Sequence, residues 1–193
     1  MKLFLFTSLF LFGFVSLACP PTGLKAGDRV FDTLVEKIGT VHETFENGKV
    51  SIRFDDLNFI STRGIENLSK STDCLKNFCK KSRIIHSMDK VGTLKEIFEN
   101  GKAAVHLDHL TQSTVVITEI EALGKGYRCI ERVCRDTRLI HSPTNSPVTV
   151  VELFDNGKAL VKFSNIQEPQ VMSFDSLGIK LGCSLRKDCT VQD

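Results

Sequence analysis

Apolar and polar residues alternate along short stretches of this chain, and these stretches recur about 55 residues apart. Pairs of such stretches flank Asn-Gly at positions 47–48, 100–101 and 156–157. Asn and Gly tolerate the positive φ that a two-residue turn requires, so Asn-Gly between alternating stretches is typical of a β-hairpin. The pattern therefore predicts three hairpins, with FENGK, FENGK and FDNGK at their turns.

A two-residue turn also predicts which residues face each other across each hairpin. In the first hairpin it places Glu46 opposite Lys49 and Phe45 opposite Val50. Side chains alternate between the two faces of a strand, so one face collects the apolar residues and should be buried. The expected buried faces are Val41, Phe45, Val50, Ile52 and Phe54, then Leu94, Phe98, Ala103, Val105 and Leu107, then Val150, Phe154, Ala159, Val161 and Phe163.

The segments around the hairpins also agree with one another. The hairpins are preceded by RVFD, RIIH and RLIH, and followed by IENL, IEAL and FDSL. The Leu of each following motif lies six residues before a Cys. Because a lone hairpin is only marginally stable in water, these segments should supply the further strands that cover the apolar face of each hairpin. We expect repeats at 25–80, 81–136 and 137–193, in an all-β fold of three tandem small antiparallel β-barrels, each with a disulfide-stapled turn.

The order of these motifs resembles that of Src-homology-3-like small barrels of the Tudor and KOW kind. The motifs are GDRV at 27–30, the hairpin, the acidic turn FDDLN at 54–58, and IENL or its equivalent. The resemblance implies a 3-10 turn before the last strand of each unit. Tudor domains bind methylated side chains in an aromatic cage, but this chain has no Trp and one Tyr, Tyr127, so that activity is not expected. Bacterial barrels of this type often act as ligand-binding or spacer modules in the envelope.

The first 18 residues are typical of a secretory signal peptide, because Lys2 is followed by an apolar run and the small-residue end SLA. Residues 19–24 would then form a tether. Cys19 would be either the acylated cysteine of a bacterial lipoprotein, and so a membrane tether, or a spare thiol of a simply secreted chain. The expected location is the periplasm or outer membrane in a bacterium, and otherwise outside the cell.

The charge balance gives no argument for binding nucleic acid. The formal net charge is +2, and removing residues 1–18 removes Lys2 and no acid, which leaves +1. Proteins that neutralise phosphates carry a clear excess of Lys and Arg. Nucleic acid is therefore not an expected partner.

Six cysteines form three close pairs, which suggests disulfide bonds in an exported chain. We expect pairing within each repeat, one of 15 connectivities that six cysteines allow. The alternative is a metal site, since His86 and His141 each follow a second Cys by seven residues. The third repeat lacks that His, and zinc needs four ligands, so disulfides are favoured. The expected pairs are Cys74 with Cys79, Cys129 with Cys134, and Cys183 with Cys189.

Basic residues surround the cysteine pairs and could form a stripe along the array. Such a stripe would bind an anionic envelope polymer or the acidic face of a partner protein. The alternative is that these side chains are simply solvated at the edges of turns. The residues concerned are Lys76, Lys80, Lys81, Arg128, Arg132 and Arg135, with Arg83 and Arg138 beside them.

A glutamate lies two residues before the Phe of each turn, on the face expected to be apolar. An unpaired carboxylate is costly there, and an Arg begins the neighbouring strand of each repeat. We expect an Arg–Glu pair within every repeat, with a structural role. The pairs are Arg29 with Glu43, Arg83 with Glu96, and Arg138 with Glu152.

Nothing in the sequence assembles a recognisable catalytic site, metal site or cofactor site. His106, Asp108 and His109 are close in sequence, but on a strand His109 points away from the other two. Three similar units suit a multivalent or extended surface better than one assembled active site. We expect a non-enzymatic exported envelope protein that serves as a binding or spacer module for an unknown polymer or protein. The alternative is an enzyme or enzyme inhibitor with a site at a barrel–barrel junction.

Overall fold

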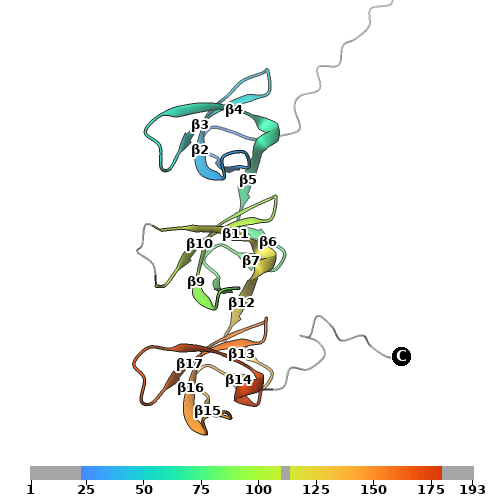
Figure 1. Cartoon of the computed structure of the whole chain (residues 1–193). Helices are drawn as coiled ribbons and strands as arrows, with labels where there is room; N and C mark the ends of the chain where they lie inside the picture. The colour runs from blue at the N-terminus through green and yellow to red at the C-terminus, as the bar shows by residue number, and fades with distance from the viewer. Residues whose placement is uncertain (1–22, 110–113, 180–193) are drawn as a thin grey trace, which may run out of the picture.

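The computed structural model describes residues 23–109 and 114–179, and within these ranges the chain is all-β with antiparallel strands and no α-helix. The strands form three groups that follow one another along the molecule (Figure 1). The predicted signal peptide at 1–18, the lipidation candidate Cys19 and the expected pair Cys183–Cys189 lie outside the described residues.

We call the three groups the first, second and third strand sets. The first set is β1 (Arg29–Asp32), β2 (Lys37–Thr44), β3 (Lys49–Phe54), β4 (Ile60–Gly64) and β5 (Leu68–Thr72). The second set is β8 (Arg83–His86), β9 (Lys90–Phe98), β10 (Lys102–Leu107), β11 (Val116–Glu119) and β12 (Leu123–Tyr127). The third set is β15 (Arg138–His141), β16 (Ser146–Phe154), β17 (Lys158–Phe163) and β18 (Gln170–Ser173). Three 3-10 turns, η1 (Ile65–Asn67), η2 (Ile120–Ala122) and η3 (Asp175–Leu177), lie where IENL, IEAL and FDSL were expected to form them.

Strands pair in the same order in each set. Consecutive strands β1 to β4 are neighbours, as are β8 to β11 and β15 to β18, and β5 and β12 return to pair with β1 and β8. The last strand of one set then pairs with the long strand of the next, β5 with β9 and β12 with β16. These pairings join all three sets into one 14-stranded antiparallel sheet.

The FENGK turns are hairpins, but the expected two-residue turn is wrong. Thr44 rather than Phe45 lies opposite Val50, and the Phe45 N–H donates to the Lys49 carbonyl at 2.9 Å. Only the glycine of each turn has positive φ, 75° at Gly48, 87° at Gly101 and 81° at Gly157. This is a three-residue loop, in which a type I turn is followed by one left-handed glycine. The expected cross-turn pair of Glu46 with Lys49 therefore does not form.

The extra loop residue moves the turn Phe to the other face of its hairpin. A register shift, typical of a β-bulge, also falls between Val41 and Glu43, and equivalent shifts occur in the other two hairpins. The remaining apolar residues of the expected faces are buried as predicted; Val41, Val50, Ile52 and Phe54 form the first core. Phe98 and Phe154 are also fully buried, but they pack outside the cores of their own sets.

Two of the expected disulfides are present, Cys74–Cys79 and Cys129–Cys134. Each closes a small hairpin, β6 (Cys74–Leu75) with β7 (Phe78–Cys79) and β13 (Cys129–Ile130) with β14 (Val133–Cys134). Leu75 and Phe78 pack against the core of the second set, and Ile130 and Val133 against the core of the third. Each hairpin therefore covers the set that follows it, and Leu24 packs similarly against the first core.

Candidate functional site

The surfaces where consecutive strand sets meet are the candidate site. We call them the first junction, between the first and second sets, and the second junction, between the second and third. At the first junction Phe31 packs on Phe98 with ring centroids 5.5 Å apart, beside Ala104. At the second junction Ile85 and Val91 pack on Phe154. The turn Phe thus inserts into the preceding set, which its new face makes possible.

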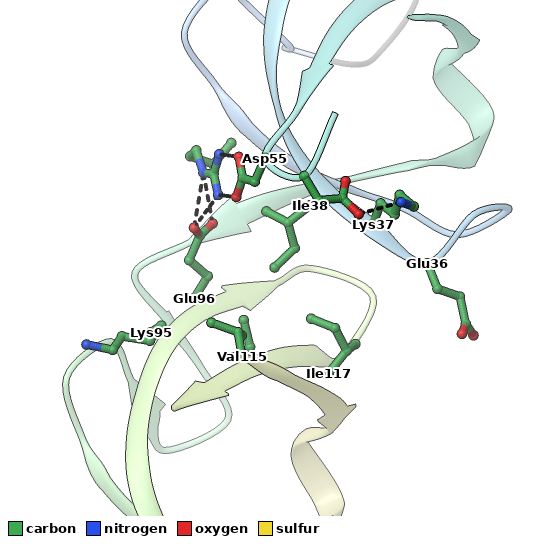
Figure 2. Close-up of a pocket in the computed structure, with 11 residues that line it drawn as sticks. Glu36, Lys37, Ile38, Asp55, Lys95, Glu96, Val115 and Ile117 are labelled. Atoms are coloured by element: carbon green, nitrogen blue, oxygen red, sulfur yellow. Dashed lines mark hydrogen bonds and ion pairs between the residues drawn. The ribbon is translucent and has the colours of Figure 1, made fainter. Parts of the chain in front are cut away.

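An arginine clamp joins the first and second sets at the first junction, beside the groove drawn in Figure 2. Arg29 Nη1 and Nη2 each donate at 2.6 Å to the two carboxylate oxygens of Asp55, in its own set. Arg29 Nε and Nη2 donate at 3.0 and 2.7 Å to Glu96 Oε1, in the next set. The planar guanidinium therefore serves two carboxylates from different sets, using the forked geometry that Lys lacks.

The second junction has the same clamp. Arg83 donates to both oxygens of Asp108, at 2.9 and 2.7 Å, and its Nε donates at 3.2 Å to Glu152 in the next set. Arg135 Nη2 adds a contact of 2.5 Å to the other oxygen of Glu152. The Glu152 side chain is only 5% exposed, and a carboxylate so shielded from water is costly unless it is paired. The two guanidinium groups of Arg83 and Arg135 compensate its charge.

The clamps hold both arginines firmly in their charged form. The hydrogen bonds that Arg29 donates to Asp55 raise its pKa well above the ordinary value; burial opposes this rise, and the hydrogen bonds and charge of Glu96 add to it. Asp108 and Glu152 raise the pKa of Arg83 in the same direction. Neither arginine exchanges a proton at any pH at which the protein would work, so the clamps serve attraction and positioning.

A groove of about 300 Å³ lies beside the first clamp. Its floor is apolar, with Ile38, Ala104 and Ile117, and Figure 2 shows Val115 and Ile117 facing Ile38 across it. Its rim carries Lys37, which is paired with Asp56. A groove of about 580 Å³ occupies the equivalent place at the second junction, with Val91, Leu160 and Val171 on its floor. Its rim residue Asp89 is paired with Lys158.

The expected Arg–Glu pairs within each repeat are wrong in their partners. Arg29 pairs with Glu96 and Arg83 with Glu152, so each pair joins one set to the next. Each glutamate lies beyond the bulge, on the face that contacts the preceding set. The other two residues of the expected pairs are Glu43 and Arg138. Both are exposed, and neither makes a side-chain ion pair within the described residues.

Half of the expected basic stripe is paired with carboxylates. Lys76 pairs with Glu121, Lys80 with Asp73 at 3.1 Å, and Arg135 with Glu152. These pairs remove much of the excess positive charge that a polymer would meet. Arg128, Arg132 and Lys81 complete the set of expected stripe residues.

The histidines considered as metal ligands serve the turns of the strand sets. His86 Nδ1 accepts from the Met88 N–H at 3.3 Å, and His141 Nδ1 lies 2.8 Å from Thr144 Oγ1. The neighbouring cysteines are bonded to each other. Across residues 23–109 and 114–179 no three His, Cys, Asp or Glu side chains gather as a metal site would require. No helix in those ranges has the length and apolar character to cross a membrane.

The acids that complete the clamps were missed at the sequence level. Asp55 and Asp108 both directly follow the last strand residue of a hairpin, and this shared position was the available signal. The pair of Asp32 with Arg63 was also missed; Asp32 is fully buried and accepts a hydrogen bond from Arg63 Nε at 2.7 Å.

Comparison with known proteins finds no family model that matches this chain, and no match among curated protein sequences.

Proposed function

We propose that this protein is a non-enzymatic, exported spacer of the cell envelope, built from three copies of one small β-barrel stacked into a stiff rod. The observation that carries the proposal is the pair of clamps, in which Arg29 and Arg83 each bind an acid of their own set and a glutamate of the next. Strand pairing and buried aromatic side chains cross the same junctions. Three kinds of contact therefore oppose bending at each junction.

The barrel and repeat assignments rest on the pairing pattern. In the first set β5 returns to β1 after η1, around a core that includes Val50 and Ile52. The second set repeats this order, with η2 before β12. The 3-10 turns before the last strands agree with the resemblance to Src-homology-3-like barrels.

Export is supported by the disulfides and by the signal-like N-terminus. Two disulfides are typical of a chain that folds in an oxidising compartment. The enzyme or inhibitor alternative would use the grooves at the junctions. The charges around them are largely paired with one another, which suits a structural joint better than proton transfer.

Small-angle X-ray scattering of the purified protein at low concentration tests the spacer. A stiff rod gives one extended distance distribution, whereas Glu96→Ala/Glu152→Ala should shorten the mean extension and broaden its spread. Glu43→Ala is the matched control, because this glutamate crosses no junction, and it should leave the profile unchanged. A wild-type profile that is already that of a flexible string contradicts the rod.

Cell fractionation and intact mass test export separately. We expect a chain that begins at Cys19 outside the cytoplasm, with or without the added mass of lipid. An unprocessed chain in the cytoplasm contradicts export while leaving the rod untouched.

A further inference from the structure

The two ends of the stack carry the two halves of one junction. Within the chain, a junction joins a lower face, which presents an Arg and an apolar residue from β1 or β8, to an upper face, which presents a Glu and the turn Phe. The third set ends the stack, and the first set begins it (Figure 1). Among residues 23–109 and 114–179, none covers the lower face of the third set or the upper face of the first.

The uncovered lower face retains its apolar contact residue. Ile140 holds the position of Phe31 and Ile85, since all three are the third residue of their strand and lie opposite Pro147, Ile38 and Val91. Phe31 and Ile85 are 1% and 0% exposed, whereas Ile140 is 51% exposed. A groove of about 390 Å³ lined by Arg138, Pro147 and Phe163 lies on the same face.

The uncovered upper face retains the turn aromatic. Phe45 is 40% exposed, although Phe98 and Phe154 at the same place in their turns are fully buried. Glu43 lies two residues before it, where Glu96 and Glu152 receive their arginines. Both halves of the contact, apolar and acidic, are therefore present and exposed.

The charges at the two ends complement each other. Arg138 begins β15 as Arg29 and Arg83 begin their strands, and Glu43 is its counterpart at the other end. Ser164 follows Phe163 where Asp55 and Asp108 follow their strands, so the position that supplies the acid to Arg29 and Arg83 offers none to Arg138. Its guanidinium can therefore donate two parallel hydrogen bonds to the carboxylate of a glutamate from another molecule.

We propose that this protein associates head to tail with further copies of itself, with Arg138 and Ile140 of one molecule on Glu43 and Phe45 of the next. The chain already makes this contact twice internally, which identifies the occupant as another copy. Such a contact uses two different surfaces, so it does not close on itself and extends the rod. Ser51 and Thr62 replace the apolar pairs Ala104–Ile117 and Leu160–Val171 on the upper face, so the association is weaker than the internal junctions and reversible.

Sedimentation velocity of the purified protein from about 1 µM to about 1 mM tests the proposal, since the contact is expected to be weak. We expect the weight-average sedimentation coefficient to rise with concentration. Glu43→Arg and Arg138→Glu should each raise the association midpoint by at least about tenfold, because each change places like charges at the contact. Ile140→Glu should do the same by charging the apolar centre.

Mixing separates this contact from any other. Glu43→Arg has two basic ends and Arg138→Glu two acidic ends, so an equimolar mixture should associate although neither variant does alone. Arg132→Glu, in an exposed hairpin turn, is the matched control and should associate as the wild type does. A wild type that stays monomeric throughout overturns the proposal, and so does association that persists in Glu43→Arg, Arg138→Glu and Ile140→Glu alike.

Discussion

Arg83 Nε lies 3.2 Å from Glu152 Oε2, although the two residues are 69 positions apart and belong to different strand sets. The same relationship holds between Arg29 and Glu96, 67 positions apart. Each arginine therefore joins its own set to the next one along the chain. This regular offset is what the proposed stiff rod would need at both junctions.

The first prediction concerns the acid of the second clamp. Glu152→Gln removes the charge that compensates Arg83 and Arg135, in a site where the glutamate is 5% exposed. We expect the free energy of unfolding to fall by about 1–3 kcal/mol. Glu43→Gln, at the equivalent exposed position, should change it by less than about 0.5 kcal/mol. Urea denaturation followed by circular dichroism measures both, and equal effects would contradict the clamp.

The second prediction compares the phenylalanine that begins FENGK in the first and second hairpins, Phe45 and Phe98. Phe98 is fully buried between the first and second sets, so Phe98→Ala leaves a cavity beside Phe31 and Ala104. We expect a loss of about 3–5 kcal/mol. Phe45→Ala should cost less than about 1 kcal/mol, because this ring is 40% exposed. Thermal unfolding of the two variants makes the comparison, and a similar loss in both would place Phe45 in a core.

Much of the fold could be predicted from local sequence patterns. Alternation correctly placed Val50, Ile52 and Phe54 in the first core, because the period of a strand is fixed by its geometry. Cysteines five residues apart correctly predicted Cys74–Cys79 and Cys129–Cys134. These features depend on neighbours in the chain, and neighbours are visible in a sequence.

The junctions could not be predicted because they depend on the offset between units. A three-residue loop and a bulge together moved Phe98 and Glu96 to the opposite face, and neither departure changes the letters of the Asn-Gly signal. Because the Arg and the Glu recur at the same place in every unit, the sequence does not distinguish a pair of Arg29 with Glu43 from a pair of Arg29 with Glu96. Only the stacking direction of the sets distinguishes them.

The third prediction tests the three-residue turn. Gly101 has φ of 87° and nothing within 4 Å of an added Cβ, so the effect of a side chain there comes from backbone strain alone. We expect Gly101→Ala to cost about 1–2 kcal/mol, and Gly101→Asn to cost less, because Asn enters the left-handed region more readily. Urea midpoints of the two variants check the order. An alanine as stable as the asparagine would contradict the left-handed glycine.

The fourth prediction concerns the first disulfide. Cys74→Ser/Cys79→Ser frees a hairpin whose Leu75 and Phe78 cover the core of the second set. A bridge closing so short a loop contributes about 2 kcal/mol, and we expect a loss of that size. Non-reducing peptide mapping of the wild type checks the pairing first. Bonds between different hairpins, or free thiols at these positions, would refute it.

The fifth prediction uses the only tyrosine of the chain. Burial, and then the negative charge of Asp155, raise the pKa of Tyr127 above its ordinary value of about 10. Tyr127 lies opposite Leu153 in the strand pairing that crosses the second junction. Because the chain has no Trp, tyrosinate absorbance reports this residue alone. The absorbance midpoint of the folded protein should lie above that of the urea-denatured protein.

The sign of the linked stability follows from the same shift. Below about pH 10, Tyr127 is protonated in both the folded and the unfolded chain, so the free energy of unfolding does not vary with pH through this group. As pH rises further, the unfolded chain loses the proton first. The folded state therefore loses stability between about pH 10 and the higher folded pKa. Opening of the second junction would hydrate the ring, so Glu152→Gln should move the midpoint toward the denatured value. Glu43→Gln, at the far end of the stack, should leave it unchanged. Identical midpoints in folded and denatured wild-type protein would show that the second junction leaves Tyr127 in water.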